Sequence, residues 1–264
     1  MLTLQTLVSC VKQDVLELPE KMNLESDAVI VNQCDKNEYT NFKYKDLTIK
    51  VYHMEERGVG LSRNTAMLHS SADIILFSDE DIVYEKGYKE RVIKEFEARK
   101  EADILIFNMD VAADRATYFT KEEKEVHWYN SGRYPTYSMA VRRESLLKKN
   151  VSFSLLFGGG AKYSNGEDSL FIWDCLKKGM RAFALPITIG KEVPRPSTWF
   201  SGYNEKFFFD RGVLYQALYG KMAKPFAWRF LLRHKNTIFT ENDKNAITLK
   251  DAYQLMKKGM EEMK

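Results

Sequence analysis

The sequence contains few of the features that mark a disulfide-stapled or membrane-spanning protein. Its 264 residues include three cysteines and six prolines, and nowhere do they reach the run of about 18 apolar residues that a spanning helix needs. Cys10, Cys34 and Cys175 are far apart and form no CxxC pair, which argues against a disulfide framework and a zinc site. The first ten residues lack a positively charged leader, so we expect no secretory signal and a cytoplasmic protein.

Charge of one sign is also not in large excess. The chain has 40 basic and 37 acidic residues and a formal net charge of +3, which is too balanced for a nucleic-acid-binding surface. Hydrophobic residues make up 44% and aromatic residues 13% of the chain. A chain of this length and composition can bury the core of one large or two small globular domains.

The order of apolar patterns predicts an α/β fold. Short apolar runs predict strands at 4–11, 27–33, 47–53, 74–77, 103–108, 137–141 and 182–187. Helical spacing predicts helices at 61–70, 86–100, 143–149 and 167–178, and a helical tail from about residue 205. Because strands alternate with helices, we expect a mainly parallel sheet covered on both faces. The segment 111–135 is polar and aromatic and resembles an insertion.

The most informative segment is the apolar run from Ile74 to Phe77, which ends in Asp79 and Asp81. A buried strand would place both carboxylates at the edge of the sheet where α/β proteins bind ligands, and residues i and i+2 face the same side. Hard oxygen ligands of this kind suit Mg²⁺ or Mn²⁺, particularly together with substrate phosphates. Chance alone supplies about one such spacing in a chain with this much aspartate, so the position after a strand carries the interpretation.

A glycine-containing turn, Gly58-Val59-Gly60, lies between a predicted strand and a predicted helix. Such a turn lets the backbone approach a phosphate closely. Arg63 stands where a dinucleotide-binding fingerprint has its third glycine, which disfavours that class. By residue type, Arg63 and Asn64 would form an exposed first helical turn, but their place upstream of the acidic strand end makes them candidates for the same site.

Glu167 and Asp168 follow Gly166 at the start of a predicted helix. Carboxylates there commonly cap the helix and complement its dipole. Next to the glycine-rich loop around Gly159, one of them could instead act as a general base. The sequence favours the second role because of these glycines.

The segment Lys224–Lys235 mixes aromatic residues with four lysines and arginines. One interpretation is a helix that packs one apolar face on the domain. The other is an interfacial helix that contacts the anionic inner face of a membrane.

Taken in order, these motifs resemble the GT-A-type glycosyltransferases, specifically the family 2-like group, over about residues 3–190. The resemblance rests on Ser9-Cys10, Asn32-Gln33-Cys34-Asp35, Ser62-Arg63-Asn64, Asp79-Glu80-Asp81 and Gly166-Glu167-Asp168. It implies a metal-dependent, inverting transfer of a sugar from a nucleotide diphosphate sugar, such as a UDP-sugar, to a hydroxyl of a glycan or lipid-linked glycan in bacterial surface polysaccharide synthesis. It also implies a catalytic domain at 1–204, with a nucleotide-sugar half at 1–108 and an acceptor half at 109–204, and a helical extension at 205–264.

The resemblance assigns roles to individual residues. Asp81 would bind Mn²⁺ or Mg²⁺, with Asp79 near the ribose or the outer ligands of the metal. Asp168 would be the base, with Glu167 as the alternative. Residues around the nucleotide sugar would be Ser9, Cys10, Asn32, Gln33, Asp35, Arg63, Asn64, Asp79 and Glu80, and residues on the acceptor side would be Gly159, Gly160 and Trp199.

The chain departs from the family pattern at two places. Asn32 and Gln33 stand where acidic residues are common, although amides can also hydrogen-bond uracil. Where many members supply a metal-binding histidine, this chain has Pro194 to Trp199, so we expect weak metal affinity without the nucleotide or partial replacement of the cation by Arg195. A sugar-phosphate nucleotidyltransferase and a non-catalytic glycan-binding protein remain alternatives, the first disfavoured because Val11–Asp14 contains no glycine.

Overall fold

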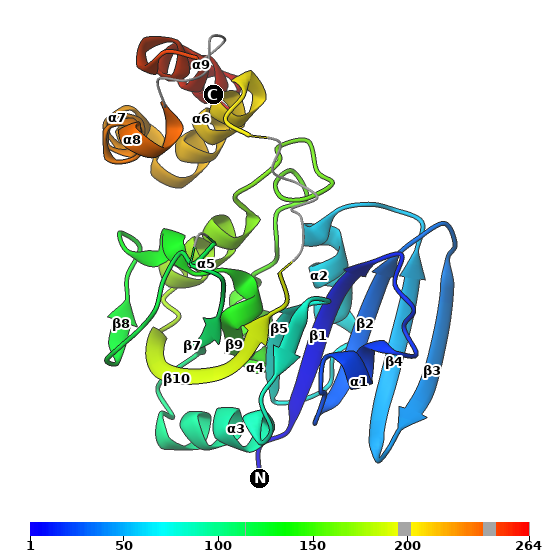
Figure 1. The fold of residues 1–264 in the computed structure, drawn as a ribbon. Helices are drawn as coiled ribbons and strands as arrows, with labels where there is room; N and C mark the ends of the chain where they lie inside the picture. The colour runs from blue at the N-terminus through cyan, green and yellow to red at the C-terminus, as the bar shows by residue number, and fades with distance from the viewer. Residues whose placement is uncertain (114, 195–201, 240–246, 264) are drawn as a thin grey trace.

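A computed structural model describes residues 1–113, 115–194, 202–239 and 247–263. In these residues one sheet of ten strands forms the body of the molecule, and a group of helices lies beyond the edge of the sheet (Figure 1). The strands are β1 Leu4–Val11, β2 Asp27–Gln33, β3 Glu38–Tyr44, β4 Leu47–Met54, β5 Ile74–Asp79, β6 Ile82–Tyr84, β7 Ile104–Asp110, β8 Lys124–Val126, β9 Met139–Arg142 and β10 Ala182–Glu192. Their order is β3-β4-β2-β1-β5-β9-β7-β10-β6, and β8 pairs with β10.

The sheet has a parallel centre made of β4, β2, β1 and β5. Nearly every residue of β1 and β2 is buried, as expected for strands covered on both faces. On one face α1 Leu18–Lys21 and α3 Tyr88–Ala98 pack against the core. On the other face α2 Val59–His69, α4 Arg143–Lys149 and α5 Glu167–Lys177 do so. The predicted α/β fold with a mainly parallel central sheet is confirmed.

Some strands differ from the sequence-based prediction. β9 is antiparallel to both of its neighbours, β5 and β7, and β10 continues to Glu192, where its end pairs with β6. β3 was not predicted because it is a polar edge strand whose residues are exposed or half-buried, so it lacks an apolar pattern. The short strands β6 and β8, with three residues each, are too brief for a periodic signal.

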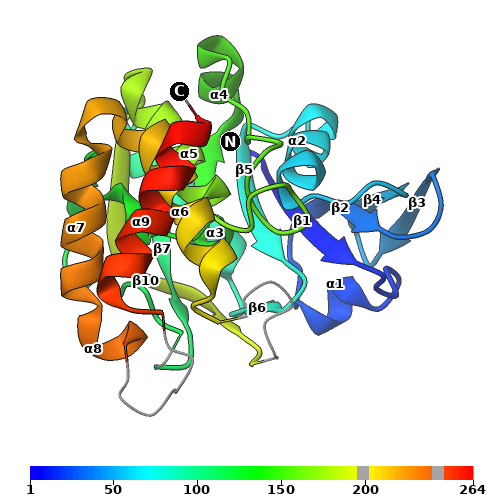
Figure 2. The ribbon, with the colours of Figure 1, turned by 90° about the horizontal axis from the view of Figure 1, so that it is seen from above.

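The C-terminal helices are α6 Glu205–Tyr219, α7 Ala223–Arg233, α8 Lys235–Ile238 and α9 Leu249–Glu262. They pack around an apolar core that includes Ala227, Leu231 and Met256, and Figure 2 shows α6, α7 and α9 side by side. A Cβ atom at Gly212 of α6 would lie 2.0 Å from the Met256 carbonyl oxygen, and one at Gly259 of α9 would lie 2.1 Å from that of Phe209. The two helices can therefore cross this closely only with glycine at both positions.

This arrangement bears on two predictions. The helical tail is confirmed, and the segment Lys224–Lys235 is largely α7, which turns Ala227 and Leu231 into the helical core as the packing interpretation requires. Contact of α7 with a membrane surface stays a prediction. Among the described residues, no helix combines the length and the apolar character needed to cross a bilayer.

Contacts between α6 and the sheet domain fix where α5 begins. Leu214 of α6 joins Phe157 and Tyr163 in one apolar cluster. Asp210 accepts hydrogen bonds of 2.8 Å from both the main-chain nitrogen and the hydroxyl of Ser164. The turn that leads into α5 is thus held by α6 at two points.

Candidate active site

Arg63 lies at the centre of the candidate site. Its side chain, only 5% exposed, extends from the first turns of α2 to three carboxylates. The Nη2 atom is 3.1 Å from Asp79 Oδ1, and Nη1 is 2.9 Å from Asp168 Oδ1 and 3.4 Å from Glu167 Oε1. The structure therefore brings together the acidic end of β5 and the carboxylate pair at the start of α5, which are far apart in the sequence.

A glycine-rich loop closes around this cluster because side chains would not fit there. Gly158 has a φ of +104°, and a Cβ atom on it would lie 2.7 Å from the side chain of Val59 and 2.8 Å from the carboxyl carbon of Glu167. Gly159 accepts a 2.9 Å hydrogen bond from the amide of Val59 through its carbonyl oxygen. A Cβ atom on Gly160 would lie 3.0 Å from the Gly58 amide nitrogen. Gly159 and Gly160 thus pack against the turn before α2, next in sequence to Gly158, which lies against Glu167. Their contact with an acceptor stays a prediction.

The start of α5 orients the two carboxylates. Gly166 precedes them with a φ of +110°, and Leu214 fills the space that a side chain at this position would need. Arg63 and Thr136 both donate to Oδ1 of Asp168. The Asp168 side chain is 30% exposed and that of Glu167 15%. Of the pair, Asp168 is the more accessible to a substrate.

The electrostatics of the cluster follow from three carboxylates around one guanidinium. The pKa of Glu167 is raised from 4.5 to about 7, because burial and the nearby Asp168 carboxylate both raise it and together outweigh the opposing effect of Arg63. Burial also raises the pKa of Asp79, with Arg63 lowering and Asp81 raising it. Burial lowers the pKa of Arg63, but the carboxylates outweigh it and raise this pKa overall. The site carries more negative than positive charge, which suits the binding of a cation.

The acidic strand end occupies a short turn. Asp79 is the last residue of β5, and Glu80 and Asp81 connect it to β6. The carbonyl oxygen of Asp81 accepts a 2.8 Å hydrogen bond from Val193, just past β10. Within the described residues, the structure contains no group of three or more His, Cys, Asp or Glu side chains that could hold a metal ion alone.

The residues at the ends of β1 and β2 shape the predicted nucleotide side of the site. Ser9 donates a 2.8 Å hydrogen bond to Ser62 at the start of α2. Gln33 Oε1 accepts a 2.7 Å hydrogen bond from the Gly58 amide. Cys10 is buried, which raises the pKa of its thiol well above the ordinary value and makes it unreactive.

The remaining predicted nucleotide-side residues also have partners in the protein. Asn32 exchanges two hydrogen bonds with the main chain of Gln13, of 3.0 and 3.2 Å. Asn64 does the same with the main chain of Phe153, at 2.8 and 2.9 Å. Asp35 is exposed and pairs with Lys12. Asn32 and Asn64 therefore hold the chain around the site, and their contact with a nucleotide remains a prediction.

Sequence reasoning missed three features of the site. Thr136 contacts Asp168, and burial together with Glu192, Asp79 and Asp168 raises the pKa of the neighbouring Tyr137. Glu192, at the end of β10, forms an ion pair with Arg115. Thr136 and Tyr137 directly follow the irregular segment 111–135, and the strand predicted at 137–141 gave no indication that Tyr137 lies near the carboxylates. Trp199 and Arg195, which sequence reasoning assigned to the site, lie outside the described residues.

The comparisons with known proteins agree with this architecture. The chain matches the family model described as glycosyl transferase family 2 over residues 3–153, which is more than half of its length, and it belongs to that family. It is therefore a glycosyltransferase, and the GT-A-type resemblance is confirmed at the level of fold. A comparison with curated proteins finds no match.

Solved structures of TarS from S. aureus are similar to this chain. TarS 1–349 in complex with UDP-GlcNAc has 17% sequence identity and a TM-score of 0.64, covering 94% of this chain and 77% of that one. The same fragment in complex with UDP has 17% identity and a TM-score of 0.62, covering 99% and 83%. Longer TarS has 16% identity and a TM-score of 0.61, and this chain covers 50% of it. At this identity the likeness is one of fold.

Proposed function

We propose that this protein transfers a sugar from a nucleotide diphosphate sugar, a UDP-sugar, to a hydroxyl of a glycan in the synthesis of a bacterial surface polysaccharide, at the cytoplasmic face. Family membership supports the reaction class, and the TarS complexes with UDP-GlcNAc and UDP support the donor. The observation that carries the proposal is the pair of contacts that Arg63 makes with Asp79 and Asp168. Because one guanidinium contacts both side chains, the carboxylate that we assign to the donor and the one that we assign to the acceptor lie close together, which supports a shared reacting centre.

The excess of negative charge around Arg63 supports a metal-dependent mechanism. A donor diphosphate is itself anionic, so a divalent cation is needed to bring it next to Asp79 and Asp81. Two carboxylates completed by phosphate oxygens are a usual arrangement for Mg²⁺ or Mn²⁺, and Asp81 lies close enough to Asp79 to raise its pKa. The bound ion would stabilise the charge that develops on the departing nucleoside diphosphate.

On the acceptor side, Asp168 would take the proton of the attacking hydroxyl. Arg63 and Thr136 hold its Oδ1 atom, so Oδ2 is the oxygen available to the acceptor. As the new bond forms between the acceptor oxygen and the anomeric carbon, the bond from that carbon to the diphosphate breaks, and one displacement inverts the anomeric centre. Positioned proton transfer contributes about 10²- to 10⁴-fold. Glu167 fits this role less well because its side chain is less accessible to an acceptor, at 15% exposed against 30% for Asp168.

The variant Asp168→Asn tests the assignment of the base. It should retain donor binding, measured by calorimetry, and lose transfer to the acceptor by about 10²-fold or more. The variant Glu167→Gln is the matched control, because it neutralises the neighbouring carboxylate. Unchanged turnover in Asp168→Asn would remove Asp168 from the mechanism.

The variant Asp81→Ala tests the metal. We expect Mn²⁺-dependent binding of UDP to weaken at least tenfold, because one of two protein ligands is lost. Asp46→Ala, at an exposed turn between β3 and β4, removes the same charge away from the site and should bind UDP normally. Equal Mn²⁺-dependent affinity in Asp81→Ala and the wild type would contradict the metal role.

A panel of UDP-sugars, with and without Mn²⁺, separates this proposal from a glycan-binding protein and from a nucleotidyltransferase. A transferase should show Mn²⁺-dependent thermal stabilisation by the donor and release UDP when an acceptor is present. Release of neither UDP nor a nucleotide-linked product would favour the non-catalytic alternative.

A further inference from the structure

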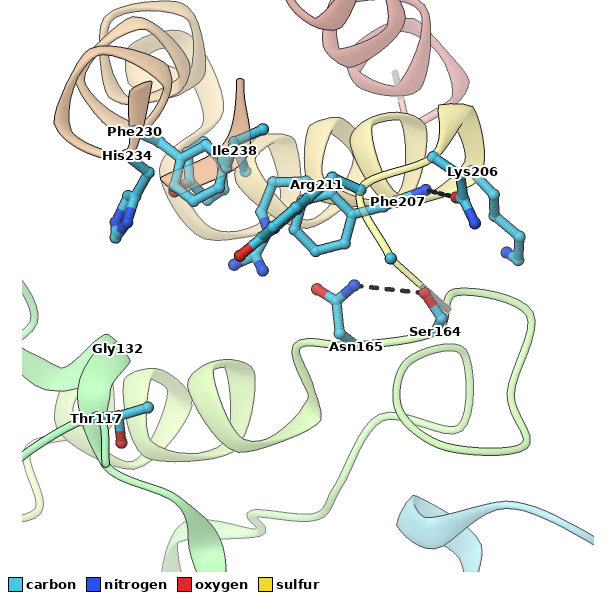
Figure 3. A pocket seen from close by; sticks show the side chains of 14 residues that line it. Thr117, Gly132, Ser164, Asn165, Lys206, Phe207, Arg211, Phe230, His234 and Ile238 are labelled. Atoms are coloured by element: carbon cyan, nitrogen blue, oxygen red, sulfur yellow. Dashed lines mark hydrogen bonds between the residues drawn. The ribbon is translucent and has the colours of Figure 1, made fainter. Parts of the chain in front are cut away.

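Two adjoining cavities lie between the C-terminal helices and the sheet domain, and Figure 3 shows the one lined by Arg211 and Lys206. Their volumes are about 690 and 450 Å³. Both are lined by Thr117, Gly132, Tyr215, Phe230 and His234, so they adjoin, and we call them together the bundle groove. Its size is that of a site for several sugar units rather than for a single small ion.

The charge of the bundle groove is of one sign. Arg133, Arg211, Arg229 and Arg233 line it, and its lining includes no Asp or Glu. Lys206 also lines it but forms an ion pair of 2.7 Å with Asp210. In the part of the chain that the structure describes, none of the four arginines forms an ion pair with a carboxylate. The groove therefore has positive charge that a negatively charged ligand could neutralise.

Arg211 is held in place without a carboxylate. Its guanidinium carbon lies 5.0 Å from the ring centres of both Phe207 and Phe230, an arrangement that stabilises a cation by contact with aromatic faces. Figure 3 shows its head directed from α6 into the groove. A fixed guanidinium of this kind loses little freedom when it binds an anion.

Aromatic rings supply the other half of the recognition surface. Tyr219 and Phe226 stack with ring centres 4.1 Å apart, and Tyr129, on the opposite wall, is 60% exposed. Flat aromatic faces pack against the C–H faces of sugar rings, while their polar atoms remain available to hydroxyls. The groove thus combines surfaces for sugar rings with cations for acidic groups.

The groove also borders the start of α5, which carries the proposed base. A Cβ atom on Gly132 would lie 3.8 Å from the hydroxyl of Ser169, the residue that follows Asp168. Asn165, in the groove wall, is two residues before Glu167. A glycan whose reacting hydroxyl lies at Asp168 could therefore continue along the groove.

We propose that the bundle groove binds the acceptor and that the acceptor is an anionic glycan, one with phosphodiester or carboxylate groups along its chain. This inference rests on the proposed transfer to a glycan, whose substrate class it narrows. The opposite charges of the two regions also orient the acceptor. The acidic cluster around Asp79 and Asp168 repels the anionic part of the glycan, whereas the arginines of the groove attract it.

Binding of fluorescently labelled probes tests the inference. The probes are a glycerol phosphate oligomer, an oligogalacturonate and neutral maltoheptaose, measured by fluorescence anisotropy with the full chain. The variant Arg229→Gln/Arg233→Gln changes two exposed side chains of α7. Lys221→Gln/Lys224→Gln is its matched control, because it removes the same charge from exposed residues outside the groove.

We expect at least one anionic probe to bind the wild type at least tenfold more tightly than maltoheptaose does. Arg229→Gln/Arg233→Gln should lose about tenfold in affinity for that probe, while the lysine control changes it less than twofold. Which of the two anionic probes binds more tightly distinguishes phosphodiester from carboxylate groups. Three results would overturn the inference. The first is that maltoheptaose binds the wild type as tightly as the anionic probes do. The others are that the arginine and lysine variants lose equal affinity, or that neither anionic probe binds the wild type.

Donor binding distinguishes failure of this inference from failure of the proposed function. Arg229→Gln/Arg233→Gln should keep the wild-type thermal stabilisation by UDP-sugar and Mn²⁺, because both residues belong to α7, whereas Asp79 and Asp81 lie at and just past the end of β5. A wild type that binds no nucleotide sugar contradicts the proposed function, and the probe measurements still report on the groove itself.

Discussion

Replacement of Arg63 by methionine tests whether this residue is what holds the candidate active site together. The guanidinium is almost fully buried and contacts Asp79, Glu167 and Asp168. Methionine retains much of the volume and removes the charge, which leaves three carboxylates close together. Loss of one partner from a buried ion pair costs roughly 3–5 kcal/mol. We therefore expect the free energy of unfolding to fall by about 3 kcal/mol at pH 7.5.

The pH dependence of this loss identifies its cause. Arg63 lowers the pKa of both Asp79 and Glu167, so its removal raises both pKa values further above those of the unfolded chain. At a pH between the pKa values of the unfolded chain and those of the folded variant, the folded state binds more protons than the unfolded chain does. The stability of the variant therefore falls as pH rises through this range. One additional proton retained in the variant corresponds to about 1.4 kcal/mol per pH unit. The deficit at pH 7.5 should accordingly shrink by about 1–3 kcal/mol at pH 5.5.

Urea unfolding at the two pH values measures both effects, with Asp79→Asn and the double variant Arg63→Met/Asp79→Asn completing a double-mutant cycle. The double variant should be more stable than the sum of the single losses predicts, because it removes one of the repelling carboxylates. A loss in Arg63→Met of less than about 0.5 kcal/mol at pH 7.5, or one that is equal at pH 5.5, would refute this account of the cluster.

Two further predictions concern the start of α5 and the helix crossing. The raised pKa of Glu167, about 7 instead of 4.5, means that wild-type stability decreases as pH rises through this interval. Glu167→Gln should remove that decrease and be more stable than the wild type at pH 8 by up to about 3 kcal/mol. Melting temperatures of the wild type and the variant that change with pH in parallel would contradict this prediction. Gly259→Ala should lower stability by about 1–3 kcal/mol, because its Cβ atom would lie 2.1 Å from the Phe209 carbonyl oxygen. Lys258→Ala, exposed on the same helix, is the control and should change stability little. Equal melting temperatures of Gly259→Ala and the wild type would show that α6 and α9 can separate at no cost.

Local patterns predicted those parts of the site that depend on local structure. The end of β5 at Asp79 and the start of α5 at Glu167 follow from an apolar run that stops and from glycines before a helical pattern. Parallel strands place such ends on the same edge of a sheet, which is why the acidic residues could be expected to share a site before their contacts were known.

The environment of Arg63 could not be predicted in the same way. Its residue type indicated an exposed position, yet it is buried because carboxylates from two distant segments satisfy its guanidinium. Thr136 lies between the irregular segment 111–135 and the predicted strand 137–141, which the structure has as a short 3-10 turn at Thr136–Ser138 followed by β9. β9 inserts between β5 and β7. Each of these features depends on contacts between residues that are remote in sequence, and a single sequence does not display them.

One stretch of α6 connects the C-terminal helices to the proposed chemistry. Asp210 holds Ser164, Leu214 occupies the space beside Gly166, and Arg211 extends into the bundle groove. Residues 210 and 214 lie one helical turn apart and face the start of α5, whereas residue 211 is rotated toward the groove. The same short piece of helix therefore positions the proposed base and presents a cation to the proposed acceptor. These contacts connect the helical extension to the start of α5, where the proposed base lies.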